Sequence, residues 1–366
     1  MESMMGSGAP AGVADDDGIT PEELQLAARN HGMPLEGLRY DLTPIGLHYL
    51  LIHFDIPAGD ADNWTVQIRG RVRSPLTLTM NDLRARPAAT HTVTLECAGN
   101  GRARLHPRPI SQPWLQEAVG TAAWTGTPLA PILAEAGLHD DAVELVFEGA
   151  DHGIQGDVEQ DYERSLTVAE AMRPEVLLAY EVNGVPLPPQ HGFPLRLLVP
   201  GWYGMTSVKW LRAITAVAEP FSGFQQDAYR VRQHEDDPGT PVTRIEPRAL
   251  MIPPGFPDFL SRVRIVDAGR CRLEGRAWSG RAPIERVEVS TDGGTEWAPA
   301  HLGELPETFQ WRGWTFDWDA RPGEFELLVR AADGTGAVQP VEQPWNHHGL
   351  ANNMAQRVPV TVRPAS

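Results

Sequence analysis

The chain has 366 residues, which is too long for one ordinary hydrophobic core and predicts two or three domains. Hydrophobic residues make up 42% and charged residues 22%, as in globular proteins, and no apolar run approaches the roughly 18 residues that a membrane helix needs. The formal net charge is −17, which opposes binding to a phosphate backbone. We therefore expect neither a nucleic acid nor a membrane as a partner.

The first 18 residues are small, polar and acidic, so they cannot bury enough apolar surface to order themselves, and we expect a disordered tail. They lack the basic and apolar pattern of an export signal, which predicts a cytoplasmic protein. Thr20, Pro21 and Glu23 then have the chemistry of a helix start. We expect this short helix to end near Gly32.

Strand-like and helix-like segments alternate from about residue 45 to 215. The expected strands are 48–54, 65–72, 91–97, 143–149, 176–182 and 194–200, and the segment 128–137 reads as a helix closed by Gly137. Glycine and proline turns separate them, which is typical of irregular loops that can surround a cofactor. The sequence therefore predicts a mixed α/β domain over residues 19–240.

Helical periodicity disappears after about residue 240, and short strands recur at the spacing of a β-sandwich. The expected strands are 271–278, 284–290, 311–318, 324–331 and 357–363, with Asp292-Gly293-Gly294 supplying the backbone freedom for a hairpin turn. We therefore predict the α+β fold class, with an all-β, immunoglobulin-like sandwich over residues 241–366.

The chain has two cysteines, and they lie in different settings. Cys97 follows a strand-like run and enters a glycine-flanked turn, Thr94-Leu95-Glu96-Cys97-Ala98-Gly99-Asn100-Gly101-Arg102, where a bulky group can approach the backbone. Thiolates are soft metal ligands, and the nearby arginines favour the deprotonated form. Residue type and spacing alone also allow Cys97 to be a buried structural cysteine. We interpret Cys271, within a strand-like run, as a core residue.

A second group of basic residues follows on turns around a buried strand. His191-Gly192-Phe193-Pro194-Leu195-Arg196 precedes Pro200-Gly201-Trp202-Tyr203-Gly204, and Lys209-Trp210 comes next. Histidine, arginine and lysine brought together can bind phosphate through charge-assisted hydrogen bonds. The sequence contains no Walker or Rossmann glycine pattern that would be an alternative phosphate site. The alternative interpretation is that these basic residues are ordinary turn and surface residues that bind no ligand.

In combination, these blocks resemble the sulfite oxidase family of molybdopterin enzymes. The blocks are Cys-Ala-Gly-Asn-x-Arg, then Asn183-Gly184 before His-Gly-Phe-Pro-x-Arg, then Pro-Gly-x-x-Gly ending at Val208-Lys209-Trp210. Further resemblance runs from Thr43-Pro44 to Pro344-Trp345-Asn346, so it covers about residues 40 to 363. It implies a sulfite-oxidase-type molybdopterin-binding domain and a homodimer formed through the β domain.

The resemblance also implies roles for single residues. Cys97 would be the protein ligand of molybdenum in a cofactor with one pterin, and His53, His191, Arg196 and Lys209 would hold the pterin and its phosphate. Ser165 would lie in another cofactor-contacting loop. On the substrate side, Arg102 and Tyr229 would act beside the metal, while Trp114 and Arg312, the latter from the β domain, would shape the anion pocket.

Two departures from the family pattern concern charge. Leu51 stands where the family usually has an arginine, two residues before His53, and Gly101 stands where it commonly has another. One lost hydrogen bond to a charged group, worth about 1.5 to 3 kcal/mol, would weaken anion binding by about ten- to a hundredfold unless Arg104, Arg108 or His106 replaces it.

The leading functional hypothesis is oxidation of sulfite to sulfate, with a small oxyanion as the substrate. We find neither a Cys-x-x-Cys-His motif nor an added haem domain, so we expect no haem in this chain and an external electron acceptor. A molybdenum-dependent reductase of a sulfoxide, nitrate or another oxo substrate is the first alternative. A non-catalytic binding or assembly module is the second, because a sandwich fold does not by itself establish activity.

Overall fold

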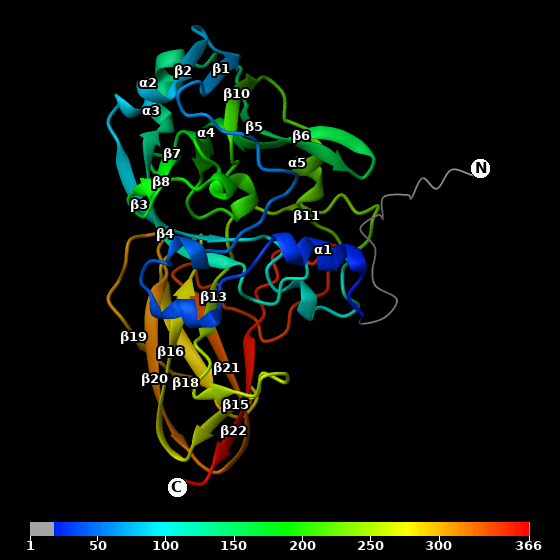
Figure 1. The fold of residues 1–366 in the computed structure, drawn as a ribbon, viewed down its shortest axis with the longest axis vertical. Helices are drawn as coiled ribbons and strands as arrows, with labels where there is room; N and C mark the ends of the chain where they lie inside the picture. Colours follow the sequence, from blue (N-terminus) through cyan, green and yellow to red (C-terminus); the bar gives the residue numbers. More distant parts are fainter. Residues whose placement is uncertain (1–17, 366) are drawn as a thin grey trace, which may run out of the picture.

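The computed structural model describes residues 18–365. The predicted tail over 1–18 therefore lies, apart from Gly18, outside the described residues. Two lobes are stacked along the long axis of the molecule: a mixed α/β lobe that contains most of the first 240 residues, and a β-sandwich that ends at the C-terminus (Figure 1). This arrangement confirms the predicted α+β fold class, whereas the boundary between residues 240 and 241 stays a prediction.

The N-terminal helix forms as its sequence predicts. Helix α1 (Pro21–Arg29) begins with a capping box, in which the Thr20 hydroxyl accepts a hydrogen bond from the Glu23 N–H and the Glu23 carboxylate accepts one from the Thr20 N–H. The helix ends at Asn30, which adopts an extended backbone. Two short 3-10 turns, Leu35–Arg39 and Ile45–Leu47, then lead toward the junction of the lobes.

The strand predicted over residues 48–54 is wrong. This segment is irregular, and its pairing is an isolated bridge between Leu50 and His31. Side chains replace a strand partner along the rest of it: the Asn30 side chain accepts a hydrogen bond from the Ile52 N–H at 2.7 Å, and the Lys209 amine donates to the Leu51 carbonyl at 2.7 Å. Because these groups satisfy the backbone, the segment runs as a loop along a pocket.

Two sheets form the first lobe. One has the order β2-β1-β10-β5-β6 and the other the order β3-β4-β7-β8, with β9 paired to β7. Their bounds are β1 (Thr65–Gly70), β2 (Leu76–Thr79), β3 (Ala89–Glu96), β4 (Val119–Pro128), β5 (Glu144–Gln155), β6 (Val158–Thr167), β7 (Leu177–Val182), β8 (Val185–Pro186), β9 (Arg196–Leu198) and β10 (Leu211–Val217). The β1–β10 pair is parallel, and the other pairs are antiparallel.

Short helices cover these sheets: α2 (Met80–Arg84), α3 (Leu129–Ala136), α4 (Val168–Ala171) and α5 (Phe224–Ala228). As predicted, α3 ends at Gly137, whose φ of 68° is a left-handed conformation that glycine adopts without a Cβ clash. The side chains of Leu129, Ile132 and Leu133 are fully buried in the core of the lobe.

The second lobe packs a four-stranded sheet, β13-β16-β20-β19, against a six-stranded sheet, β14-β15-β22-β21-β17-β18. Their bounds are β13 (Arg248–Met251), β14 (Phe256–Pro257), β15 (Arg264–Asp267), β16 (Gly269–Trp278), β17 (Ile284–Ser290), β18 (Ala298–Pro299), β19 (His301–Leu302), β20 (Arg312–Ala320), β21 (Gly323–Asp333) and β22 (Gln356–Arg363). A small pair, β11 (Arg230–Val231) with β12 (Thr240–Pro241), precedes them. In β22 the buried residues Val358, Val360 and Val362 alternate with less buried ones, as a strand with one face on the core requires.

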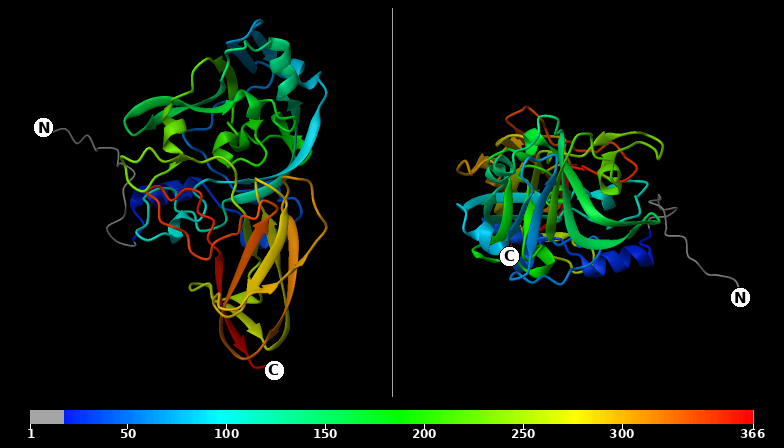
Figure 2. Two further views of the ribbon diagram at one scale, coloured as in Figure 1. Left: turned by 180° about the vertical axis from the view of Figure 1, so that it is seen from behind. Right: turned by 90° about the horizontal axis from the view of Figure 1, so that it is seen from above.

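The two lobes share a hydrophobic cluster at their junction. Met33, Leu38 and Ala98 from the first lobe pack with Trp278 and Trp311 from the sandwich. The connection between β21 and β22 also leaves the sandwich and returns beside the first lobe, where the Ala351 N–H donates to the Ala98 carbonyl at 2.8 Å (Figure 2). The sandwich therefore reaches the turn that carries Cys97.

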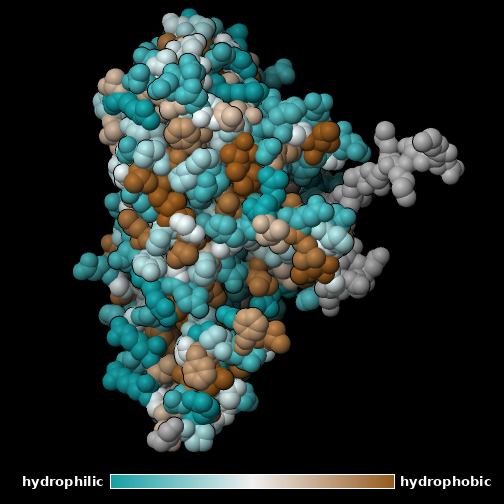
Figure 3. Space-filling view, viewed as in Figure 1, coloured by the Kyte–Doolittle hydropathy of each residue, from teal (hydrophilic) through white to brown (hydrophobic). Residues whose placement is uncertain are grey.

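The surface is predominantly polar. On the face shown in Figure 3, apolar side chains lie in small separate patches among hydrophilic residues. Among residues 18–365, none of the helices combines the length and apolar content that crossing a bilayer requires.

Candidate active site

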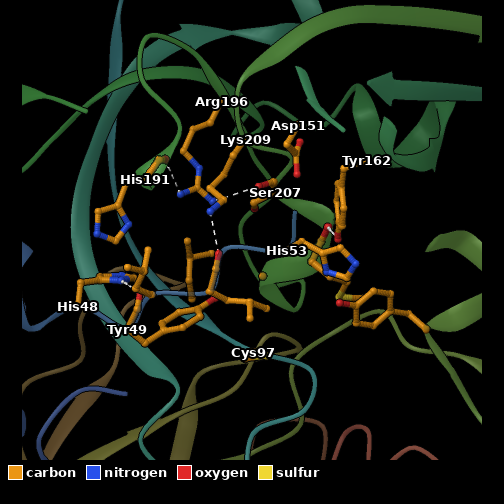
Figure 4. Close-up of a pocket in the computed structure, with 16 residues that line it drawn as sticks. His48, Tyr49, His53, Cys97, Asp151, Tyr162, His191, Arg196, Ser207 and Lys209 are labelled. Atoms are coloured by element: carbon orange, nitrogen blue, oxygen red, sulfur yellow. Dashed lines mark hydrogen bonds between the residues drawn. The ribbon is translucent and has the colours of Figure 1, made fainter. Parts of the chain in front are cut away.

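A pocket of about 670 Å³, partly open to solvent, lies inside the first lobe near the junction (Figure 4). Six of the residues predicted from the sequence line it: His53, Cys97, His191, Arg196, Lys209 and Tyr229. They come from segments that are separated by up to 176 residues, and the fold brings them around one space.

Cys97 is the first residue after β3, and its side chain is 7% exposed. The turn holds its backbone on both sides, because the Cys97 N–H donates to the Ala118 carbonyl at 2.9 Å and the Cys97 carbonyl accepts from the Asn100 N–H at 3.0 Å. Burial raises the pKa of the Cys97 thiol, and the charge of Arg102 opposes that rise. The thiol therefore faces the pocket beside a cation that favours its deprotonated form.

Arg102, Trp114 and Tyr229 surround the thiol. Cys97 packs in one small cluster with Trp114, and Arg102 and Tyr229 both interact electrostatically with it. The Trp114 side chain hydrogen-bonds the Cys97 thiol, and this bond opposes the rise in the thiol pKa. The Nε of Arg102 is buried and has no hydrogen-bond partner within the described residues. Because buried donors are almost always paired, this donor is available to a bound group. Burial raises the pKa of Tyr229 to about 12, so its hydroxyl remains protonated at neutral pH.

Two buried cations lie at the other end of the pocket. Arg196 donates to the carbonyls of His191 and Ser207, both at 3.1 Å, and its guanidinium lies 4.7 Å from the ring centroid of Trp124. Lys209 donates to the carbonyls of Leu51 at 2.7 Å and Gln190 at 3.0 Å. These partners are neutral, so they orient the cations without cancelling their charge.

Burial makes the charged forms of Arg196 and Lys209 less favourable than in water. Burial lowers the pKa of Arg196 to about 10, and burial together with the nearby Arg196 lowers the pKa of Lys209. Asp151, only 4% exposed, partly offsets the charge of Lys209, and burial raises the pKa of this carboxyl. His191 is neutral, because burial lowers its pKa to about 2. An anion placed here would relieve the repulsion between Arg196 and Lys209.

His53 lies on the wall of the pocket and is held from the β5–β6 hairpin. Its Nε2 lies 2.7 Å from the side-chain oxygen of Gln155, and Gln225 joins the same network with a 2.9 Å hydrogen bond to Gln155. Burial lowers the pKa of His53, which keeps the ring neutral at neutral pH.

Four of the ten predicted site residues do not line the pocket: Arg102 and Trp114, which lie beside Cys97, and Ser165 and Arg312. Ser165 is in strand β6 rather than a loop, and its buried hydroxyl does not line the pocket. Arg312 is at the start of β20, where it donates to the carbonyls of Gly303 at 2.9 Å and Ile284 at 2.8 Å, both within the sandwich. The structure therefore does not bring Arg312 together with the residues around Cys97.

The three residues considered as replacements for the missing arginine also lie elsewhere. Arg108 is buried in an ion pair with Glu23 of α1, and Arg104 and His106 are exposed. Leu51, at the position of the missing charge, does line the pocket. At this position the pocket wall is therefore apolar.

Sequence reasoning missed several pocket residues. His48, Tyr49, Asp151, Tyr162, Met205 and Ser207 also line the pocket. His48 is 4% exposed, its ring lies 5.6 Å from that of His191, and burial lowers its pKa to about 4. The signal in the sequence was a histidine next to an apolar run. A strand over residues 48–54 does not predict that His48 faces a pocket.

His348 is a further residue that the sequence did not reveal. It lies in the β21–β22 connection, where burial and the charges of His347, Arg102 and Arg232 lower its pKa to about 4. Gly349 packs directly on Arg102, since a Cβ at this glycine would lie 2.8 Å from the Arg102 Cβ. The sandwich thus contributes His348, rather than Arg312, to the surroundings of Arg102. The adjacent Trp345-Asn346 pair was the signal in the sequence.

Comparison with protein families gives two matches that follow one another along the chain. Residues 53–225 match the oxidoreductase molybdopterin binding domain, and residues 257–363 match the Mo-co oxidoreductase dimerisation domain. The first match contains every pocket residue predicted from the sequence except Tyr229, and the second covers most of the sandwich.

Similar proteins include the mitochondrial sulfite oxidase of Mus musculus, which is 35% identical over 344 residues that cover 88% of this chain and 62% of that protein. The NADH nitrate reductase 1 of Oryza sativa subsp. japonica is 32% identical over 352 residues, covering 88% of this chain and 38% of that protein. Among solved structures, the sulfane dehydrogenase SoxCD of Paracoccus pantotrophus is similar, with a TM-score of 0.78, 25% identity and coverage of 98% and 92% of the two chains. The chain thus spans less than two thirds of the length of the two curated relatives.

Proposed function

The chain belongs to the sulfite oxidase family of molybdopterin-dependent oxidoreductases, and from this premise we propose that it oxidises sulfite to sulfate with a molybdenum–pterin cofactor. The observation that carries the proposal is one pocket with a thiol at one end and, at the other, two buried cations that donate hydrogen bonds to backbone carbonyls. A soft metal ligand and a phosphate site are the two contacts that such a cofactor needs.

The residues present fit the cofactor. Cys97 would supply the thiolate ligand, while Arg196 and Lys209 would hold the phosphate. Burial and, second, repulsion from Arg196 lower the pKa of Lys209, and a bound dianion would offset both effects. The neutral rings of His53 and His191 would hydrogen-bond the pterin. Ser165 is buried in β6 and does not line the pocket, so we assign it no contact with the cofactor.

Once bound, the cofactor supplies a two-electron acceptor and an exchangeable oxygen, and the protein groups position the anion. We propose that Arg102, with its unpaired Nε, binds an oxygen of sulfite. Trp114, hydrogen-bonded to the Cys97 thiol, would shape the anion pocket. Tyr229 would donate a hydrogen bond to the anion, because its raised pKa keeps the hydroxyl protonated. His348, near Arg102, is neutral at neutral pH and adds no charge. Arg312 has no such role in this arrangement, since its guanidinium is bonded inside the sandwich.

In the balanced reaction, sulfite and water give sulfate, two protons and two electrons. We propose that the electrons pass to an acceptor outside this chain and that the protein works as a homodimer in the cytoplasm. The match of residues 257–363 to a dimerisation domain supports the dimer. We propose that this acceptor is a redox partner that takes the electrons one at a time or in pairs.

One observation favours a second candidate, reduction of a less charged oxo substrate. Leu51 presents an apolar side chain to the pocket at a position where the family usually has an arginine, and a nitrate reductase is among the relatives. An apolar wall at this point favours a neutral substrate such as a sulfoxide over an anion.

Steady-state assays separate the candidates. We expect sulfite-dependent reduction of an artificial acceptor by metal-replete protein, in excess of sulfoxide or nitrate reduction measured with a reduced dye. Protein with full molybdenum and pterin content but no sulfite-dependent turnover would exclude sulfite oxidation. Purification without molybdenum or pterin from cells that make the cofactor would instead favour a non-catalytic module.

Cysteine variants test the metal ligand separately. Cys97→Ser should abolish turnover and change the spectrum of the metal, because a hydroxyl is a poor replacement for a soft thiolate. Cys271→Ser is the matched control, since Cys271 is half-buried in β16 of the sandwich, and it should leave both nearly intact. Equal behaviour of the two variants would contradict the assignment of Cys97.

A further inference from the structure

The turn that carries Cys97 is fastened by the sandwich as well as by its own lobe. We define the Cys97 loop as residues 96–102. The Ala351 N–H donates to the Ala98 carbonyl at 2.8 Å, and the Asn352 side chain donates to the Gly101 carbonyl at 2.7 Å. These bonds come from the β21–β22 connection, which is 250 residues further along the chain, so the geometry of the loop depends on docking of the sandwich.

A buried ion pair reinforces this attachment. Glu96 immediately precedes Cys97, and its carboxylate lies 2.8 Å from the Nε of Arg248 in β13, with both side chains 1% exposed. The Trp278 indole N–H donates to the other carboxylate oxygen at 2.7 Å, and Asn100, inside the loop, donates to the first at 3.0 Å. Strands β13 and β16 of the sandwich thus hold the carboxylate from one side, and the loop holds it from the other.

Arg248 also contacts the loop and its anchor directly. One of its Nη atoms donates to the Asn352 carbonyl and lies 3.5 Å from the Asn100 carbonyl. A single guanidinium therefore connects Glu96, the loop backbone and the β21–β22 connection. A buried pair of this kind is weak evidence for stability, because desolvation of the two charges offsets their attraction. Removal of either partner, however, leaves an uncompensated buried charge, so the pair disfavours arrangements in which the two groups separate.

We propose that Arg248 is a positioning residue: through Glu96 and Asn352 it fixes the Cys97 loop from the sandwich and sets the orientation of the thiolate toward the metal. This proposal rests on the proposed function, because it assumes that Cys97 is the metal ligand. Metal sites tolerate displacements of only about 0.5 Å, so a loop held through one guanidinium is sensitive to its loss. The sandwich then acts within its own chain, in addition to any contact with a second copy.

The test uses Arg248→Met, Glu96→Gln and the double variant E96Q/R248M in the full chain. Arg264→Met is the matched control, because Arg264 is also buried in the sandwich, at 6% exposure, but donates to carbonyls of residues 253–255 and not to the Cys97 loop. Hydrogen exchange of the Asn100 and Arg102 amides is measured in cofactor-free protein. Molybdenum content, the metal absorption and electron paramagnetic resonance spectra, kcat and KM are measured in loaded protein.

We expect exchange of these two amides to be about tenfold faster in Arg248→Met than in the wild type and unchanged in Arg264→Met. In loaded protein the metal spectrum should change, and kcat should fall by up to about a hundredfold without a change of KM. The double variant should recover part of the loss, since it no longer buries an unpaired carboxylate. If Arg248→Met does not fold, Arg248→Lys, which keeps the charge but loses the multiple contacts, is compared with Glu96→Gln by the same measurements.

Exchange and spectra of the Arg248 variant that match those of Arg264→Met would overturn the proposal and leave the pair as a contact between lobes. Failure of the proposed function has a different signature. In that case wild-type protein does not oxidise sulfite, while the effects on amide exchange and on the metal spectrum still decide the role of Arg248.

Discussion

His48 is buried between the pocket and a small apolar space, and its ring is packed against His191 and Trp124. Its Nδ1 lies 3.1 Å from the Tyr49 carbonyl, and the ring also interacts with the Gly120 backbone. Burial lowers the pKa of His48 from the usual 6.5 to about 4. The folded protein therefore keeps this ring neutral at a pH where the unfolded chain binds a proton.

This shift predicts a loss of stability in mild acid. Between pH 6.5 and about 4 the unfolded chain takes up the proton and the folded chain does not, so the free energy of unfolding should fall by about 3 kcal/mol because of His48. His48→Phe should remove this part of the slope, as measured by denaturant unfolding at several pH values. His301→Phe, at an exposed site, should not. An unchanged slope in His48→Phe would contradict the assignment.

Leu51 offers a test of substrate charge at the residue scale. Leu51→Arg places a cation on the pocket wall and should lower the KM for sulfite by about ten- to a hundredfold, the effect of one charge-assisted hydrogen bond. Leu51→Gln is the uncharged control of similar reach. A KM that is unchanged, or that falls equally in both variants, would show that this wall does not face the anion.

At the scale of elements, α1 depends on one buried ion pair. The Glu23 side chain has no solvent exposure, and its carboxylate pairs with Arg108 and accepts a hydrogen bond from the Ser111 N–H at 3.4 Å. The same guanidinium donates to the Gly18 carbonyl, so it connects the start of the helix to the segment after the Cys97 loop. Arg108 is therefore committed to structure and does not supply the charge that Leu51 lacks.

We expect Arg108→Met to destabilise the docking of α1 by about 3 to 5 kcal/mol, because it leaves the Glu23 carboxylate buried and unpaired. Denaturant unfolding measures the change, and limited proteolysis near residues 18–31 detects release of the helix. Arg71→Met breaks an exposed pair with Asp141 and should leave the free energy of unfolding nearly unchanged, because solvent screens the pair. Similar losses in both variants would argue against a special role for the buried pair.

At the scale of the whole molecule, we propose two roles for the sandwich: it fixes the Cys97 loop through Arg248 and the β21–β22 connection, and it forms the dimer. The family match of residues 257–363 predicts a dimer with two-fold symmetry. Light scattering at micromolar concentration should give twice the chain mass of 40.2 kDa. A monomer under these conditions would restrict the sandwich to its role within one chain.

Several features followed from the sequence alone because their causes are local. The capping box at Thr20 and Glu23, the left-handed stop at Gly137 and the turn after Glu96 each depend on residues within a few positions of one another. The strand pattern of the sandwich is local in the same sense, since alternate side chains face the core. The order of the motifs around Cys97, His191 and Lys209 also predicted the family, and with it one pocket that these residues share.

The tertiary structure decided what depends on contacts between distant segments. The segment 48–54 looks like a strand by hydropathy, yet Asn30 and Lys209 satisfy its backbone and make it a pocket wall. The family resemblance predicts Arg312 in the anion pocket, whereas the fold bonds Arg312 inside the sandwich and places His348 near Arg102, because no local pattern shows which sandwich loop returns to the first lobe. The Glu96–Arg248 pair spans 152 residues and forms only when the two lobes dock. Local sequence sets backbone conformation, whereas burial and charge at the site arise only from long-range packing.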